Sequence, residues 1–291
     1  PSNLPPPLEY QKDWRLLDLG NPEALDWVKT KVSRDISDYG VDIYRHDFNM
    51  HPLYYWRTDE EGDREGIHEI KYIQGLYEYF DFLSNEHPGL LLDNCASGGR
   101  RLDFEMMKRS VPLWRSDYCW DPIGGQSITF ALSNWLPVHG LGAVLADAYS
   151  LRSGYGTNVS FAFDYYNKDA VFWEPLTSGI EEYRMVREFF FGDYYPLTDY
   201  STGEAAWMAW QFHREDLKSG IVQAFRRQAC EEVSLRVCLQ GLLSTSKYEL
   251  TDLDTGEKRV ESGATLMSEG FVVTRKTRPS SALIRYRVVD P

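Results

Sequence analysis

VDIYRHDFN, residues 41–49, begins with residues that favour a β-strand and ends in polar side chains. Before it, residues 21–40 predict a helix that starts with an asparagine cap and a proline and ends at a glycine. After it, residues 69–87 predict an aromatic-rich amphipathic helix, and GLLLDNC (89–95) predicts the next strand. Strands that alternate with helices in this way favour a parallel sheet.

The same alternation continues through the first 200 residues. Further strands are predicted at 15–20, 111–117 and 142–148, and further helices at 102–110, 124–140 and 178–192. The predicted strands end in the polar side chains of Asp47, Asn49, Asp93, Cys95, Asp117 and Asp147. Such side chains at the carboxyl ends of successive parallel strands are typical of a (β/α)8 (TIM) barrel. An open doubly wound sheet also binds ligands at that edge, but no phosphate-binding GxGxxG follows a predicted strand.

Only roughly five or six of the eight barrel strands are recognisable before residue 200. Either irregular stretches conceal strands, or the chain starts partway round the barrel, which the absence of an initial methionine favours. From about residue 205, short β-branched and aromatic runs separated by polar turns predict a small antiparallel β-domain. We therefore expect an α/β fold: a (β/α) barrel catalytic domain in residues 1–200, incomplete at its N-terminus, and an antiparallel β-sandwich in 201–291.

Composition excludes several classes of partner. The formal net charge of −13 argues against nucleic acid and anionic membranes, which reward a basic surface. No apolar run approaches the ~20 residues that span a bilayer, so we expect a soluble protein and leave its compartment open. The 4 cysteines form no CxxC pair and are expected to be free thiols, with no metal site. The 14% of aromatic residues suits a protein that stacks on sugar rings or one with a large aromatic core.

Asp47 is the first candidate for chemistry. Strand alternation places Arg45 and Asp47 on the same face, and a neighbouring cation keeps a carboxylate ionised, as a nucleophile requires. A purely structural ion pair at the end of a strand is the alternative interpretation.

Asp117 is the second candidate. It follows VPLWRS and lies among Trp114, Tyr118 and Trp120, and apolar surroundings favour the protonated carboxyl that a general acid needs. Capping of the following turn is the alternative. Together the two residues fit glycoside hydrolysis, in which an ionised and a protonated carboxyl about 5–5.5 Å apart give retention of configuration.

The stretch CASGGRRLD (95–103) lies between these candidates. Ser97 and Gly98 allow the backbone to approach a ligand closely, and Arg101 offers a fork of donors to sugar hydroxyls. An ordinary turn between a strand and a helix would also explain the glycines.

Three blocks in this order, YRHDFN, DNCASGGRRLD and WRSD, resemble the glycoside hydrolase family 36 α-galactosidases, the melibiase group. In that family a K-W-D-M-N block holds the nucleophile, a C-S-G-G-G-R-x-D block lines the sugar site and an S-D block holds the acid/base. The separation of Asp47 and Asp117, 117 − 47 = 70 positions, is close to what the family leads us to expect. The resemblance extends over nearly the whole chain, because 210–227 is similar to the start of the family's C-terminal sandwich.

The resemblance implies specific roles. Asp47 would be the nucleophile and Asp117 the acid/base. The residues expected to bind substrate are Arg45, Asn49, Cys95, Ser97, Gly98, Arg101 and Trp114. The sequence departs from the pattern with Arg45 in place of a lysine, His46 in place of a tryptophan, and YCWDP after Asp117 in place of an N-T-D run.

The resemblance favours a retaining enzyme that removes terminal α-linked galactose from oligosaccharides or glycoconjugates, without metal or organic cofactor. An α-N-acetylgalactosaminidase or a raffinose-type galactosyltransferase would keep both aspartates, and a non-catalytic carbohydrate-binding relative is a third interpretation. Family members carry an N-terminal β-sandwich and earlier barrel strands. We therefore expect weak or no turnover and poor solubility if these 291 residues are the whole protein. A homo-oligomer is compatible with the family, although no interface is recognisable in the sequence.

Overall fold

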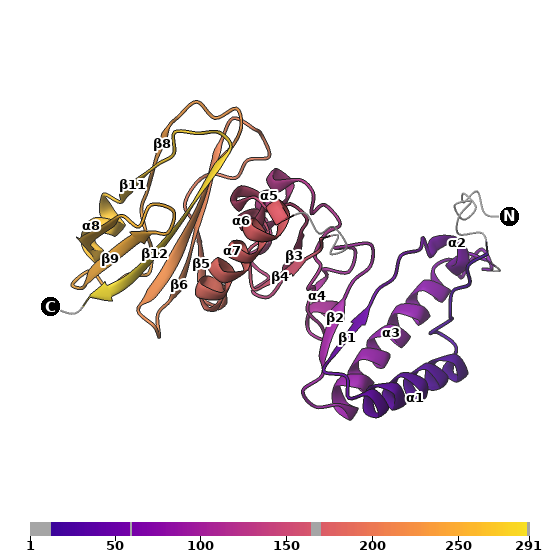
Figure 1. Ribbon diagram of the computed structural model, residues 1–291. Helices are drawn as coiled ribbons and strands as arrows, with labels where there is room; N and C mark the ends of the chain where they lie inside the picture. The colour runs from indigo at the N-terminus through magenta and orange to yellow at the C-terminus, as the bar shows by residue number, and fades with distance from the viewer. Residues whose placement is uncertain (1–12, 59, 164–169, 290–291) are drawn as a thin grey trace. The chain divides into compact units, whose positions relative to one another are not determined.

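The computed structural model describes residues 13–58, 60–163 and 170–289. The chain divides into two compact units, Pro1–Arg115 and Ser116–Pro291, which are described separately (Figure 1). The first unit contains two parallel strands and four helices among its described residues. In chain order these are α1 (Pro22–Tyr39), β1 (Ile43–His46), α2 (Leu53–Trp56), α3 (Ile67–Glu86), β2 (Leu91–Asn94) and α4 (Phe104–Met107).

The helix–strand–helix–strand order predicted around residues 41–49 is confirmed. The side chain of Asn21 accepts a hydrogen bond from the Glu23 N–H at the start of α1, and Gly40 ends the helix in the left-handed conformation (φ 63°). β1 then pairs in parallel with β2, which places Arg45 opposite Asp93. The sequence therefore predicts both the helix ends and the strand pair on which the candidate site depends.

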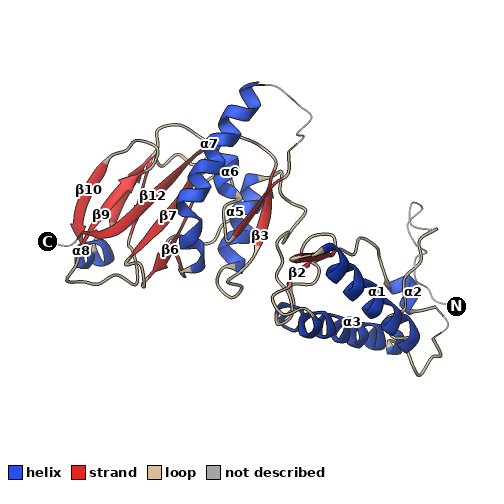
Figure 2. Ribbon diagram, turned by 60° about the horizontal axis from the view of Figure 1, so that its bottom comes forward, coloured by secondary structure: helices blue, strands red, loops and turns tan. Residues whose placement is uncertain are grey.

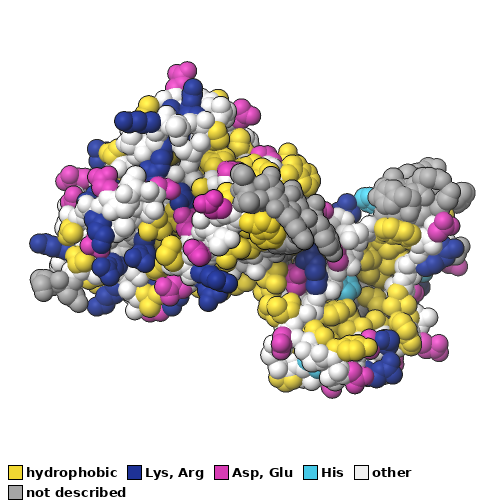
Figure 3. Space-filling view, in the orientation of Figure 1, with side chains coloured by type: hydrophobic (Ala, Val, Ile, Leu, Met, Phe, Trp, Pro, Cys, Tyr) yellow, Lys and Arg dark blue, Asp and Glu magenta, His cyan; other side chains and the backbone are white. Residues whose placement is uncertain are grey.

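The core of the first unit lies between its two long helices. Leu76, Phe80 and Leu83 lie on one face of α3, at the spacing of helical turns, and are fully buried. They belong to one cluster with Leu25 and Ile36 of α1. Hydrophobic side chains also gather at the surface over β1 and α3, as Figure 3 shows.

Two predicted strands are wrong. Residues 15–20 form no strand, because this segment packs its backbone against α3 instead of a neighbouring strand: a Cβ added to Gly75 would lie 2.0 Å from the Leu19 carbonyl oxygen. Residues 111–117 form only a single bridge, Val111 with Asp93, because the Leu113 N–H donates to the Asp93 carboxylate (2.9 Å) rather than to a backbone carbonyl.

The second unit begins with helices and a parallel strand pair. The predicted helix at 124–140 is shorter than expected, and the predicted helix at 178–192 continues into a 3-10 turn. The elements are α5 (Pro122–Leu132), β3 (Gly140–Ala143), α6 (Ala148–Ser153), β4 (Asn158–Phe161), α7 (Ala170–Val186) and the 3-10 helix η2 (Arg187–Phe191). β3 pairs in parallel with β4, a strand that the sequence analysis did not predict.

An antiparallel sheet forms the rest of the second unit (Figure 2). Its strand order is β10-β9-β12-β7-β6-β5, and a separate antiparallel pair joins β11 to β8. The strands are β5 (Asp193–Pro196), β6 (Trp207–Arg214), β7 (Ser219–Arg226), β8 (Ser234–Val237), β9 (Lys247–Asp252), β10 (Lys258–Ser262), β11 (Phe271–Thr274) and β12 (Ser280–Val289), with the helix α8 (Gly263–Ser268) before β11. The antiparallel sheet predicted from the C-terminal sequence is therefore confirmed.

Both faces of the large sheet are covered. Along β6, Met208, Trp210 and Phe212 belong to the core shared with α5, α6 and α7. Trp207 and Ala209, which alternate with them, belong to a second core shared with β8, β11 and α8. β6 and β7 are thus buried on both sides, which explains why their sequences are almost continuously apolar.

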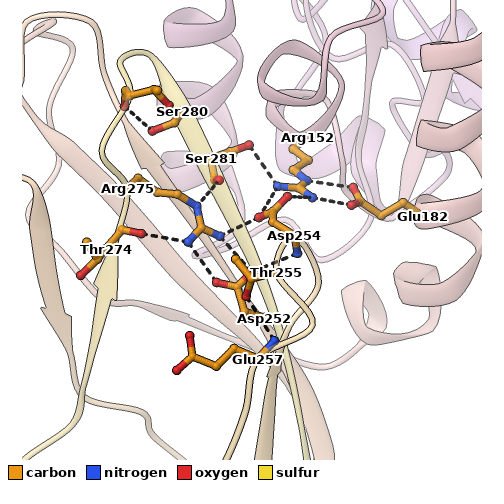
Figure 4. A network of polar contacts seen from close by, with 11 residues as sticks. Arg152, Glu182, Asp252, Asp254, Thr255, Glu257, Thr274, Arg275, Ser280 and Ser281 are labelled. Carbon is orange, nitrogen blue, oxygen red and sulfur yellow. Dashed lines mark hydrogen bonds and ion pairs between the residues drawn. The ribbon is translucent and has the colours of Figure 1, made fainter.

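A buried ion-pair network joins the helices of the second unit to its sheet (Figure 4). Arg152 of α6 is 3% exposed and donates to both carboxylate oxygens of Glu182 on α7 (2.9 and 2.5 Å). It also donates to both oxygens of Asp254 (3.0 and 2.7 Å), which accepts another bond from Arg275 (2.6 Å). Burial alone would lower the pKa of Arg152, but these carboxylates raise it, so the guanidinium stays charged.

Among the described residues, no helix combines the length and apolar character needed to cross a bilayer.

Candidate active site

Arg45 connects two carboxylates at the end of β1. Its guanidinium donates to Asp93 on the neighbouring strand (Nη1 to Oδ2, 2.7 Å) and lies 3.5 Å from Asp47 (Nη2 to Oδ2). Asp93 is buried and accepts a second bond from the Leu113 N–H. Asp93 therefore fixes the orientation of Arg45, and Arg45 in turn faces Asp47.

Asp47 is an ionised carboxylate at the surface of the first unit. Burial by itself would raise its pKa, but hydrogen bonds from Asn49, Cys95 and the Phe48 N–H, together with the charge of Arg45, lower it. The Phe48 N–H lies 2.8 Å from Asp47 Oδ1. A carboxylate held deprotonated and partly exposed in this way can act as a nucleophile.

The turn after β2 approaches Asp47 with its backbone. Ser97 and Gly98 both have positive φ values, 47° and 77°, and Cys95 Sγ lies 3.8 Å from the Gly98 carbonyl oxygen. Asn49 Oδ1 accepts hydrogen bonds from the N–H and the hydroxyl of Ser97 (3.1 and 3.2 Å). The turn is thus fastened to the end of β1, and burial raises the pKa of the Cys95 thiol to about 11, which keeps it neutral.

Arg101 makes contacts within the first unit. Its guanidinium contacts His46 (Nη1 to Nδ1, 3.0 Å) and lies over the ring of Phe48 at 4.7 Å. The Arg101 carbonyl oxygen accepts a bond from Asn94 (3.1 Å). Burial lowers the pKa of Arg101, and the contact with His46 shows that part of the guanidinium is committed within the protein.

His46 should remain neutral at pH values at which an exposed histidine is already protonated. Burial, and then the charge of Arg101, lower its pKa to about 4, although Asp47 acts in the opposite direction. An unfolded histidine has a pKa of about 6.5, so between about pH 6.5 and pH 4 the unfolded chain binds a proton that the folded chain does not. Stability is therefore lost as the pH falls through this window. From pH 7 to pH 5 the loss due to His46 should be about 2 kcal/mol.

NMR titration of the His46 ring and urea unfolding at pH 7 and pH 5 would check this prediction. His46→Gln should remove most of this pH-dependent loss, whereas His68→Gln, an exposed histidine on α3, should leave it unchanged. A His46 midpoint near 6.5 would contradict the prediction.

Asp117 belongs to the second unit and is exposed. It lies at a bend in a segment without regular secondary structure, between Ser116, whose hydroxyl accepts a bond from the Tyr118 N–H (3.0 Å), and Asp121, which caps α5. Trp114 belongs to the first unit and is half-buried.

The first unit therefore gathers most of the predicted site residues. Those joined by direct contacts or by one turn are Arg45, Asp47, Asn49, Cys95, Ser97, Gly98 and Arg101. Two partners were missed as functional residues: Asp93, which holds Arg45, and His46, which contacts Arg101. The sequence does contain a signal for Asp93: it is a charged residue in the mainly apolar strand GLLLDNC. Among the residues that the structure describes, no three His, Cys, Asp or Glu side chains gather as a metal site would require.

Two models of known protein families match the chain. The melibiase family model matches residues 8–155, and the model of the glycosyl hydrolase family 36 C-terminal domain matches residues 207–285. The first match includes both candidate carboxylates, and the second covers most of the antiparallel sheet.

Individual proteins to which the chain is similar are named α-galactosidases. The chain is 27% identical over 275 residues to the bifunctional α-galactosidase/sucrose kinase AgaSK of Mediterraneibacter gnavus, a match that covers 88% of this chain and 27% of that protein. The α-galactosidase from Lactobacillus brevis has a similar solved structure, with a TM-score of 0.81, 20% identity and coverage of 95% of this chain and 39% of that one. A variant of α-galactosidase AgaA from Geobacillus stearothermophilus, solved in complex with raffinose, gives a TM-score of 0.79 at 20% identity, with coverage of 94% and 39%.

The chain thus spans between about a quarter and two fifths of the length of these relatives. The melibiase match alone extends over half of the residues and contains the Arg45–Asp47 pair and the turn fastened to it. This chain belongs to the melibiase family, within glycoside hydrolase family 36.

Proposed function

We propose that this chain carries the catalytic residues of a retaining α-galactosidase, which removes terminal α-linked galactose from oligosaccharides. The observation that carries the proposal is the state of Asp47. Its pKa is lowered by hydrogen bonds and by Arg45, and it lies beside a turn in which Ser97 and Gly98 have positive φ values. AgaA, a structural neighbour solved with raffinose, supports an α-galactoside as the substrate.

In the proposed reaction Asp47 attacks the anomeric carbon and Asp117 protonates the oxygen of the departing sugar. A covalent galactosyl–Asp47 ester forms while the glycosidic C–O bond breaks. Water then attacks the same carbon, Asp117 removes its proton, and galactose leaves with its α configuration retained. The reaction requires both carboxyls to reach one anomeric carbon from opposite faces and uses no cofactor.

The other site residues would position the sugar. Arg45 is held on one side by Asp93, so its remaining donors can contact both Asp47 and a hydroxyl of the substrate. Asn49, Cys95, Ser97, Gly98, Arg101 and Trp114 would complete the binding residues.

We also propose that the parallel pairs β1–β2 and β3–β4, with their helices, are part of a (β/α)8 barrel in residues 1–200, and that residues 201–291 form the accompanying β-sandwich domain. The TM-scores of 0.81 and 0.79 to family 36 α-galactosidases support this fold. β5, at 193–196, already pairs with the sheet, so it would act as the connection between the two domains.

The anomeric form of the first product tests the proposal. The chain would be incubated with raffinose and with α-galactosyl fluoride, and the sugar released first would be followed by proton NMR. We expect α-galactose, which then mutarotates. Release of β-galactose would contradict retention, absence of turnover with both substrates would contradict the proposed activity, and transfer of galactose to a second sugar in place of hydrolysis would favour the galactosyltransferase.

A further inference from the structure

Two aromatic side chains next to Asp117 are exposed in the second unit. Tyr118 and Trp120 are 49% and 58% exposed, and their ring centroids lie 5.3 Å apart. Most other ring pairs of this unit lie in the core, such as Trp210 with Phe225. Two large rings side by side in water are unfavourable unless something covers them.

The backbone holds these rings in place. The Ser116 hydroxyl accepts a bond from the Tyr118 N–H (3.0 Å), and Asp121 fixes the other end of the segment by capping α5. A Cβ added to Gly124 would lie 2.3 Å from Tyr118 Cδ1, so this glycine provides the space that the Tyr118 ring occupies.

Cys119 separates the two exposed rings. Residues 116–121 form no helix or strand and bend at Asp117 and Trp120, and Cys119, between the two aromatic residues, is half-buried. Cys119 and Trp120 line a small recess against Gly125 and Leu141. The rings are therefore presented at the surface by a segment anchored on both sides, rather than by a free loop.

We infer that Tyr118 and Trp120 form the subsite for the sugar unit that leaves, the part of the substrate attached to the terminal galactose. This inference rests on the proposed function. A general acid donates its proton to the oxygen of the leaving group, so side chains beside it lie where that group departs. Tyr118 follows Asp117 directly and Trp120 is the third residue after it. The ligand class is a neutral hexose or disaccharide with an apolar ring face, which stacks on aromatic side chains without a charged partner.

The first test measures binding without requiring hydrolysis. Sucrose, the leaving portion of raffinose, is added to the full 291-residue chain, and saturation-transfer NMR records magnetisation passed from the protein to the sugar. Trp120→Ala and Tyr118→Ala should each weaken the signal, by about tenfold in affinity for Trp120→Ala, which is about 1.4 kcal/mol. Trp120→Phe, which keeps a ring, should retain most of it. No sucrose signal from the unmodified chain would overturn the inference.

Trp27→Ala is the matched control, because Trp27 on α1 is equally exposed at 61% and lies in the other unit. An equal loss of signal in Trp27→Ala and Trp120→Ala would overturn the inference, since it would show unspecific contact of sucrose with exposed rings. The two rings could instead be covered by a second copy of the chain. Sedimentation of the unmodified chain and of Trp120→Ala tests this, because an oligomer that dissociates on substitution would also overturn the inference.

The second test separates this inference from the proposed function. α-Galactosyl fluoride has no leaving sugar, so Trp120→Ala should leave its KM unchanged while raising the KM for raffinose about tenfold. If the unmodified chain hydrolyses neither substrate, the proposed function fails, whereas the sucrose signal and its loss in Trp120→Ala still decide the subsite. Equal changes in KM for both substrates would overturn the subsite while leaving the proposed function intact.

Discussion

Asp47→Ala is expected to lower the turnover of raffinose by at least about 10⁴-fold, because loss of the nucleophile removes the covalent step on which retention depends. Neither the backbone pairing of β1 with β2 nor the bond from Arg45 to Asp93 involves the Asp47 side chain, so the substitution should not disturb the strand pair. Initial rates with raffinose and p-nitrophenyl α-galactoside would measure the effect.

Azide distinguishes a nucleophile from a structural carboxylate. In Asp47→Ala, azide can enter the space of the missing side chain, form a C–N bond at the anomeric carbon and displace p-nitrophenolate. The single displacement gives β-galactosyl azide. Asp81→Ala, which removes an exposed aspartate paired with Arg109, is the control and should keep full activity. Failure of azide to restore turnover, or formation of the α-azide, would remove the assigned role from Asp47.

Asp117→Ala should have an effect that depends on the leaving group. A sugar alkoxide is a poor leaving group and needs protonation, so hydrolysis of raffinose should fall by about 10²–10⁴-fold. Fluoride leaves without a proton from the enzyme, so the first step with α-galactosyl fluoride should be nearly unaffected. Comparison of kcat/KM for the two substrates measures the difference.

The product formed with azide supplies an independent check on Asp117. In Asp117→Ala the galactosyl–Asp47 ester still forms. Azide, which needs no general base, attacks this ester to give α-galactosyl azide. The two variants therefore yield azides of opposite configuration. An equal loss of activity toward raffinose and α-galactosyl fluoride would contradict an acid/base role, and Asp117 would then be assigned to binding or folding.

Local signals predicted the elements around the site well. The asparagine cap, the proline and the final glycine of residues 21–40 act within one helix, and α1 begins and ends where they indicate. The predicted strand at 111–117 failed because its hydrogen bonds depend on a distant residue. The buried Asp93 carboxylate, 20 positions away from Leu113, takes the N–H that would have continued the strand.

The same difference between local signals and contacts with distant residues applies to the candidate site. Arg45 and Asp47 could be paired from strand alternation alone, and their contact at 3.5 Å confirms that prediction. The roles of Asp93 and His46 depend on the register of β1 with β2 and on the path of the turn to Arg101, neither of which a single sequence specifies. Their importance therefore emerged only from the arrangement of the strands in space.

Arg152 constrains how this chain can be recombined with its relatives. One of its acidic partners, Glu182, comes from α7, and the other, Asp254, comes from the hairpin between β9 and β10. Removing one partner from a buried ion pair typically costs about 3–5 kcal/mol. A chimera joined near residue 200 would take Arg152 and Glu182 from one parent and the residue at position 254 from the other. Such exchanges should succeed between parents that share both acids; for other parents, the two segments must come from the same protein.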